Sequence, residues 1–168
     1  MPSSSLTVAA SFASYPSIQT TGYGTLMKRI IVATDGSDGG NRAVETAAGI
    51  AKATGASLLI VTVGGDITGA ELRRLAKAQG DLSHALETKS SRILARARKL
   101  AHRLGVSAPA LRCEWGDPAE VIVEMAQREK ADAVVVGRRG RSRLSELLLG
   151  SVSQKVIGLA PCTVIVVP

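Results

Sequence analysis

Five short runs of aliphatic residues recur along the chain, and each is bounded by polar or glycine-containing segments. The runs are rich in Val, Ile and Leu, which is typical of strands buried on both faces of a sheet. The clearest are SLLIVTV at residues 57–63 and AVVV at residues 133–136. The pattern predicts five strands, at residues 29–34, 57–63, 110–115, 133–136 and 163–167.

Between these runs the apolar residues recur every three or four positions, which is the period of a helix with one buried face. Asp117, Pro118 and Glu120 fit the N-cap, N1 and N3 positions of one such helix. Helices are predicted at residues 41–54, at 69–104 with a break near Gly80 left open, at 118–130, and from 150 onwards. Alternation of strands and helices predicts an α/β fold in which a parallel sheet carries helices on both faces.

Length and composition favour one domain preceded by a short extension. The chain has 168 residues, which is enough for a single domain with a sizeable core. Residues 1–26 are rich in Ser, Thr, Ala and Gly and carry no charged side chain. We therefore expect a disordered N-terminal extension at 1–26 and one folded domain at 27–168.

The basic balance of the chain, a formal net charge of +7, does not by itself identify a partner. Lys and Arg are spread over the predicted helical faces, apart from an arginine group at residues 138–143, and no aromatic residues lie among them to stack on bases. We interpret most of this charge as solvated surface and expect neither nucleic acid nor a membrane as partner. The two cysteines lack CxxC or metal-ligand spacing, which is typical of a reduced, cytoplasmic protein.

The segment that most clearly indicates a ligand-binding site follows the fourth predicted strand. It has the spacing Gly137-x2-Gly140-x9-Gly150-Ser151. Glycines let a backbone approach a ligand closely. The first N–H groups of a helix that begins at Ser151 have no partner within that helix, and together with the helix dipole they favour an anion such as phosphate. On spacing alone, a glycine-rich loop in which Ser151 caps its own helix explains the stretch equally well.

This stretch resembles the nucleotide-binding signature G-x2-G-x9-G-[ST] of the universal stress protein family. The start of the predicted domain, residues 30–37, and its end, residues 160–167, resemble that family too, so the likeness covers about residues 27–168. The resemblance implies an open five-stranded sheet of order 3-2-1-4-5, a Rossmann-like fold of the adenine nucleotide alpha hydrolase type. Strands 1 and 4 then flank a topological switch point, where such sheets bind ligands.

The resemblance also implies which residues meet the nucleotide. One block follows strand 1, the end of strand 2 meets adenine through its backbone, and the glycine segment holds ribose and phosphates. These residues are Ala33, Thr34, Asp35, Val63, Gly137, Arg138, Gly140, Gly150, Ser151, Val152 and Ser153. A local role in its own turn remains the alternative for Asp35, and the arginines after Gly137 either neutralise phosphate or stay open to solvent.

These features favour a cytoplasmic stress-response protein that acts as a regulatory module, binding ATP, with Mg²⁺ bridging the phosphates, and hydrolysing it slowly or not at all. P-loop, dinucleotide-binding and nucleophile-elbow motifs are absent, and no general base is evident. We therefore predict no catalytic residue and no metal site built by the protein alone. A slow Mg²⁺-dependent ATPase and a sensor of AMP or cyclic AMP are the alternatives. The resemblance further implies a homodimer through the fifth strand, residues 163–167.

Overall fold

The fold is described by a computed structural model over residues 27–64, 80–140 and 149–168. The five strands are β1 (Arg29–Ala33), β2 (Ser57–Val63), β3 (Ala110–Glu114), β4 (Ala133–Gly137) and β5 (Thr163–Val167). The helices are α1 (Asp38–Thr54), α3 (Gly80–Arg103), α4 (Pro118–Arg128) and α5 (Ser151–Leu159). Every predicted strand is present within one residue of its expected ends. The predicted extension at 1–26 and the predicted helical stretch at 69–79 lie outside the described residues.

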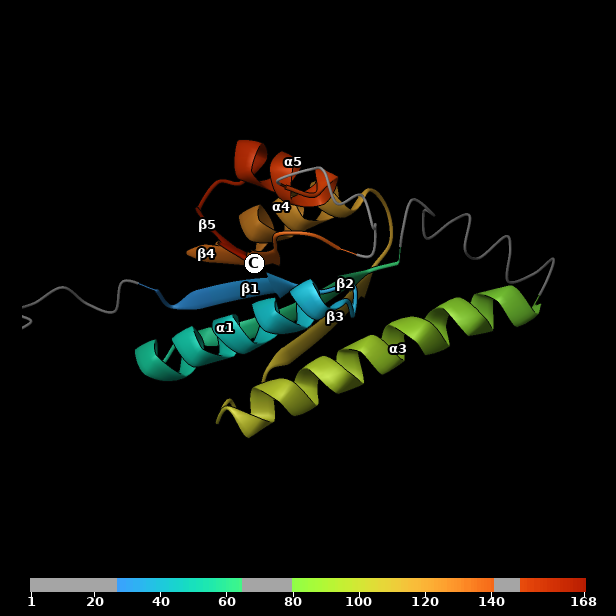
Figure 1. Ribbon diagram of the computed structural model, residues 1–168, viewed down its shortest axis with the longest axis horizontal. Coiled ribbons are helices and arrows are strands. Elements are labelled where there is room, and N and C mark those ends of the chain that lie inside the picture. Colours follow the sequence, from blue (N-terminus) through green and yellow to red (C-terminus); the bar gives the residue numbers. More distant parts are fainter. Residues whose placement is uncertain (1–26, 65–79, 141–148) are drawn as a thin grey trace, which may run out of the picture.

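All four strand pairs are parallel, and the sheet order is β3-β2-β1-β4-β5, as the resemblance implied. Helices α1 and α3 cover one face of the sheet, and α4 and α5 cover the other (Figure 1). Each face has its own aliphatic core, and Val32 and Val135 lie in the first while Ile31 and Val134 lie in the second. None of the helices in the described residues has an apolar stretch long enough to cross a bilayer.

Helix α1 begins three residues earlier than the hydrophobic pattern predicted, at Asp38 instead of Asn41. Ser37 is its N-cap, and the Ser37 side chain accepts a hydrogen bond from the N–H of Gly40 at 3.1 Å. The first turn therefore contains Gly39 and Gly40, which lay before the predicted start because residues 34–40 are rich in turn formers and glycine is a poor helix former. Tertiary contacts of these glycines, described below, override that preference.

The order of the strands creates a crevice at one end of the sheet. Strands β1 and β4 are neighbours, but β1 leads into α1 on one face while β4 leads towards α5 on the other. The two connections therefore leave the sheet in opposite directions, which is the geometry of a switch point. Residues after β1 and after β4 face each other across this crevice.

Candidate functional site

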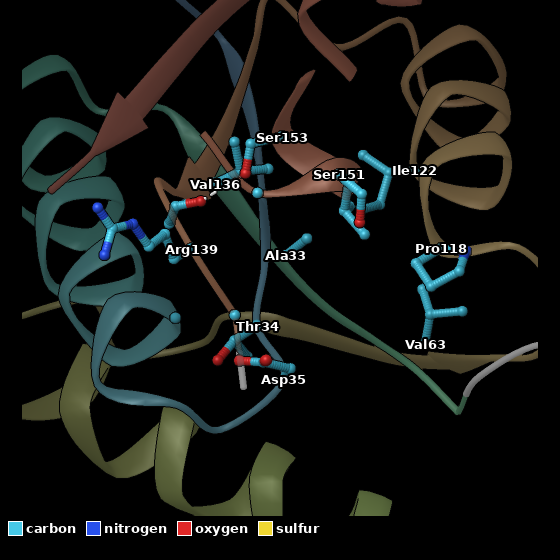
Figure 2. Close-up of a pocket in the computed structure, with 15 residues that line it drawn as sticks. Ala33, Thr34, Asp35, Val63, Pro118, Ile122, Val136, Arg139, Ser151 and Ser153 are labelled. Atoms are coloured by element: carbon cyan, nitrogen blue, oxygen red, sulfur yellow. Dashed lines mark hydrogen bonds between the residues drawn. The ribbon is translucent and has the colours of Figure 1, made fainter. Parts of the chain in front are cut away.

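A pocket of about 260 Å³ lies at the carboxyl ends of the strands, between the connections that follow β1 and β4. This volume is just below the roughly 300–1,000 Å³ of typical small-molecule pockets. The pocket therefore suits a group the size of a nucleoside, and the rest of a longer ligand would lie at the pocket opening. Figure 2 shows Thr34 and Asp35 at one side of the pocket and Val63, Pro118 and Ile122 at another, with Ser151 beside Ile122. The lining residues are Ala33, Thr34, Asp35, Gly40, Val63, Pro118, Ile122, Val136, Gly137, Arg139, Gly140, Gly150, Ser151, Val152 and Ser153.

The structure brings together ten of the eleven residues predicted to meet the nucleotide. The exception is Arg138, which is exposed and lines a neighbouring polar hollow at the start of α1. Five lining residues were missed by the sequence analysis, namely Gly40, Pro118, Val136, Ile122 and Arg139. Val136 lies at the end of the fourth predicted strand, and Pro118 begins the helix after the third. Because the ends of parallel strands meet at one edge of the sheet, the position of both residues in the pocket lining could have been inferred from topology. Ile122 lies one helical turn after Pro118 and could have been found from the same face of α4.

The N-terminus of α5 points its first amide groups at the crevice. Gly150 is the N-cap and makes no side-chain cap, so the alternative in which the Ser151 hydroxyl caps its own helix is wrong. The N–H groups of Ser151, Val152 and Ser153 have no partner within the helix, as in any first turn. The helix therefore presents amide donors and its positive dipole end to whatever occupies the pocket.

The Ser153 hydroxyl serves the fold and leaves only the residue's amide to a ligand. The side chain is 4% exposed and donates to the carbonyl of Gly137 at 2.7 Å (Figure 2). The N–H of Gly150 donates to the carbonyl of Arg138 at 2.9 Å. These two bonds fasten the start of α5 to the end of β4, so the first turn of α5 keeps a fixed position relative to the sheet.

Asp35 combines the local role and the pocket-lining role that the sequence left open. Its Oδ1 accepts a hydrogen bond from the N–H of Ser37 at 2.9 Å, which stabilises the turn before α1. Its Oδ2 faces Gly140, because a Cβ placed on Gly140 would lie 2.7 Å from that oxygen. The carboxylate therefore sits at the closest approach of the two connections that form the pocket.

The backbones of Gly39 and Gly137 are in direct contact. A Cβ on Gly137 would lie 2.7 Å from the carbonyl carbon of Gly39, and a Cβ on Gly39 would lie 2.6 Å from the carbonyl oxygen of Arg139. Any side chain at either position would force α1 and β4 apart. Gly137 was expected to let a ligand approach, but its missing side chain is required by the protein's own packing.

The apolar wall comes from the end of β2 and the start of α4. Val63, Pro118 and Ile122 lie together at the side of the pocket away from α1 (Figure 2). Asp117 is the N-cap of α4 and accepts hydrogen bonds from the N–H groups of Ala119 and Glu120 at 2.9 and 3.0 Å, as predicted. The cap fixes where Pro118 and Ile122 lie, so the wall depends on it.

Positive charge is concentrated at the pocket's α1 side. Arg139 turns its guanidinium towards α1 (Figure 2), and its Nε is buried without a hydrogen-bond partner among the described residues. Asp35 is the one carboxylate in the described lining. Nowhere in the described parts of the chain do three His, Cys, Asp or Glu side chains form a group suited to a metal ion. The site therefore offers an apolar surface for a ring system and amide donors for an anion within one pocket.

Comparison with known proteins gives consistent matches. A family model described as the universal stress protein family matches residues 27–168. A universal stress protein of Methanocaldococcus jannaschii is 36% identical over 145 residues, which cover 84% of this chain and 82% of the relative. A solved universal stress protein in complex with cAMP is 31% identical with a TM-score of 0.65, covering 84% of this chain and 96% of that one. UspA from Lactobacillus plantarum is 28% identical with a TM-score of 0.69, covering 84% and 98%.

Proposed function

Because this chain belongs to the universal stress protein family, we propose that it is a regulatory module that binds an adenine nucleotide, ATP with Mg²⁺, at the pocket between β1 and β4. The observation that carries the proposal is that an apolar wall and a helix N-terminus line one cavity. The adenine ring would lie against Val63, Pro118 and Ile122. The phosphates would extend towards Gly140 and the amides of Ser151 and Val152.

The proposed Mg²⁺ arrives with the nucleotide, because Asp35 alone among the described lining residues offers a carboxylate oxygen and Mg²⁺ commonly binds through phosphates and one or two carboxylates. One oxygen of Asp35 already accepts the Ser37 amide. This supports binding without fast turnover, since a general base needs freedom to take a proton from water. We expect turnover well below the ~1 s⁻¹ of slow ordinary enzymes.

Two alternatives each rest on a specific observation. The position of Asp35 opposite Gly140 favours a slow Mg²⁺-dependent ATPase, and phosphate release that Asp35→Asn abolishes would establish it. The relative solved with cAMP favours a sensor of AMP or cyclic AMP. Mass spectrometry of small molecules released from protein purified without added nucleotide, followed by calorimetric titration of ATP, AMP and cAMP, ranks the three ligands.

A charge placed at the start of α5 tests the site directly. Ser151 is exposed at the first position of the helix. Ser151→Asp puts a carboxylate where the phosphates are proposed to lie, while Asp at a helix N-terminus stabilises the helix by about 0.3–1 kcal/mol. We expect the Kd for Mg²⁺-ATP to rise at least about tenfold, or about 1.4 kcal/mol. Binding of adenosine, which has no phosphate, should change little.

The matched control is Ser151→Asn, which has the same shape as Asp without the charge. It should keep ATP affinity within about threefold, since most of the amide donors come from the backbone. Equal losses of ATP and adenosine binding in Ser151→Asp would contradict the phosphate position, and no ATP binding by the unmodified protein would contradict the proposed function as a whole.

We further propose that the protein is a cytoplasmic homodimer that pairs through β5. β5 is the last strand of the sheet and has β4 on one side only. Ile157 and Leu159, which are 47% and 58% exposed, lie in α5 shortly before it in the chain. An unpaired edge beside exposed aliphatic side chains is a surface that proteins normally cover, and a second copy related by a two-fold axis would do so.

A further inference from the structure

The outer face of α3 carries a straight row of five cations, which we call the basic row: Lys89, Arg92, Arg96, Lys99 and Arg103. Their spacing of three and four residues places all five along one side of the helix. All five are exposed. Residues 89 to 103 rise about 21 Å along the axis, so the row is as long as a short helix.

The opposite side of α3 faces the protein. Ala97, Leu100 and Ala101 are buried in the core shared with α1. The basic row lies on the exposed part of the helix surface, and α3 runs beside α1 on the same face of the sheet (Figure 1). The nucleotide pocket lies at the carboxyl ends of the strands and has no lining residue from the described part of α3.

Among the described residues, no ion pair joins the basic row to a carboxylate. The ion pairs found among the described residues involve Arg128 and Lys155, not α3. Glu87 is the one acidic side chain in the described part of the helix, residues 86–103. In sequence, residues 1–26, 65–79 and 141–148 each carry no net negative charge. The basic row is therefore available to an acidic group of another molecule.

The basic row also opposes the stability of the isolated helix. Like charges three or four residues apart repel one another by about 0.2–0.5 kcal/mol per pair. Solvated lysines and arginines are ordinary on a helix surface, but they are normally mixed with acids that relieve this repulsion. Five cations in register, with no acidic residue from 89 to 103, are explained if the row meets an acidic surface.

A second feature beside the row indicates the shape of that surface. Thr88, Ser91 and Ala95 follow one another at helical spacing next to the basic row and border a shallow hollow together with Glu87 and Arg92. Small side chains let another rod-shaped element lie close to the helix backbone. Over residues 86–103 this face exposes no aromatic or large aliphatic side chain that would stack on bases or insert into lipid.

We propose that the outer face of α3 is a docking surface for an acidic helix of a partner protein. The partner helix would lie along the small residues and present Asp or Glu to the basic row at the same spacing of three and four residues. Complementary charge of this kind fixes the register of two helices and speeds their encounter. This interaction surface is separate from the proposed nucleotide site and does not depend on it.

The test uses a synthetic 21-residue alanine-based helical peptide with five glutamates along one side at the matching spacing. Its control peptide has the same composition with the glutamates spread around the helix. Binding to the full-length protein is followed by fluorescence anisotropy in about 50 mM salt, where surface charge is least screened. We expect the striped peptide to bind at least about fivefold more tightly than the control peptide.

Variants locate the contact. Arg96→Gln with Lys99→Gln removes two cations from the middle of the row and should weaken binding of the striped peptide about fivefold. Both side chains are exposed, so the fold should be kept or slightly stabilised. The matched control is Lys28→Gln with Lys130→Asn, which removes two exposed cations elsewhere and should change binding less than about twofold; Asn suits position 130, where φ is 51°.

Each remaining outcome would overturn the proposal. Equal binding of both peptides, or equal losses in both double variants, would mean unspecific attraction by net charge. Tighter binding of a 20-base-pair DNA duplex, or of vesicles containing phosphatidylserine, with loss in the Arg96 and Lys99 variant would assign the row to nucleic acid or membrane. No binding of any probe at low salt would mean that the row is an ordinary solvated face.

Discussion

At the scale of single residues, the pocket depends on how closely its two connections approach at Asp35 and Gly140. Gly140→Ala would place a methyl group 2.7 Å from Oδ2 of Asp35, well inside van der Waals contact. The carboxylate or the loop must move, and the proposed phosphate position moves with it. We expect the Kd for Mg²⁺-ATP, measured by calorimetry, to rise about tenfold, since displacements of about 1 Å in a preorganised site cost that much or more.

A matched glycine separates this effect from a general change in stability. Gly49 lies inside α1, and a Cβ there would meet nothing within 4 Å. Gly49→Ala should therefore raise the free energy of unfolding by about 0.5–1 kcal/mol and leave ATP affinity unchanged. Unaltered ATP affinity in Gly140→Ala would show that the contact with Asp35 does not shape the site.

The residues of the pocket could be predicted unevenly, for physical reasons. Residues that belong to the glycine signature or to the end of β1 were predicted because their motifs resemble those of the family, whereas spacing alone left a capped loop equally good. The sequence did not show that Arg139, and not Arg138, lines the pocket. That difference depends on the turn after β4, which sends the Arg138 side chain to solvent and the Arg139 side chain towards α1. Gly40 was missed because its reason is a tertiary contact: a Cβ there would lie 2.7 Å from Oγ1 of Thr34.

At the scale of elements, the N-cap of α4 sets the apolar wall of the pocket. Hydrogen bonds from the N–H of Glu120 and from Lys155 hold the pKa of Asp117 below its ordinary value. Asp117→Ala should lower the free energy of unfolding by about 1 kcal/mol at pH 7, as loss of an N-cap does. Chemical denaturation at pH 7 measures this loss, and calorimetry should show weaker adenosine binding because Pro118 and Ile122 shift.

The same shift predicts a pH dependence of stability. Because the folded-state pKa is the lower one, the charged cap stabilises the fold above the unfolded-state pKa, near pH 4. That contribution is lost as the pH falls below about 4 through the lowered pKa. Asp117→Asn keeps an N-cap oxygen but cannot ionise, so it should flatten this part of the pH profile while costing less than Ala at pH 7. Identical profiles for the unmodified protein and Asp117→Asn would contradict the assignment.

Elements were predictable where local pattern and tertiary structure agree. Residues 57–63 and 163–167 were predicted to the residue, because a run of β-branched residues between turn formers leaves little choice of boundaries. The start of α1 was placed too late, because glycines in a first turn disfavour a helix. Packing of Gly39 on Gly137 and capping by Ser37 outweigh that cost, and neither contact is visible in a local pattern.

At the scale of the whole molecule, the order of the strands could not be predicted from the alternation of strands and helices alone. Alternating strands and helices fix a parallel sheet with covered faces, but several orders satisfy that pattern. The order β3-β2-β1-β4-β5 was expected from family resemblance and is confirmed. This order creates the pocket, since β1 beside β4 brings together residues more than a hundred positions apart. The same order leaves β5 at the edge.

Strand β5 forms that edge of the sheet and has β4 on one side only. The N–H of Thr163 donates to the backbone carbonyl of Asp132, and the carbonyl of Val167 accepts from the N–H of Arg138. Alternate residues of β5 therefore bond to the β4 side. Val164 and Val166 therefore direct their backbone groups away from the sheet. Val164→Pro removes one outward N–H and no bond to β4, a position where an edge strand tolerates proline. We expect it to dissociate the proposed homodimer at micromolar concentration in light scattering.

Val164→Ala is the matched control, because it shortens the same side chain and keeps the N–H. Val164 is partly buried and packs on the core beneath α4 and α5, so both variants lose similar packing and about 1 kcal/mol of stability. A dimer that survives Val164→Ala and not Val164→Pro requires the outward backbone group of β5. A dimer that survives both would place the interface elsewhere, with exposed Ile157 and Leu159 the next surface to alter. A monomeric unmodified protein would exclude pairing through β5 altogether.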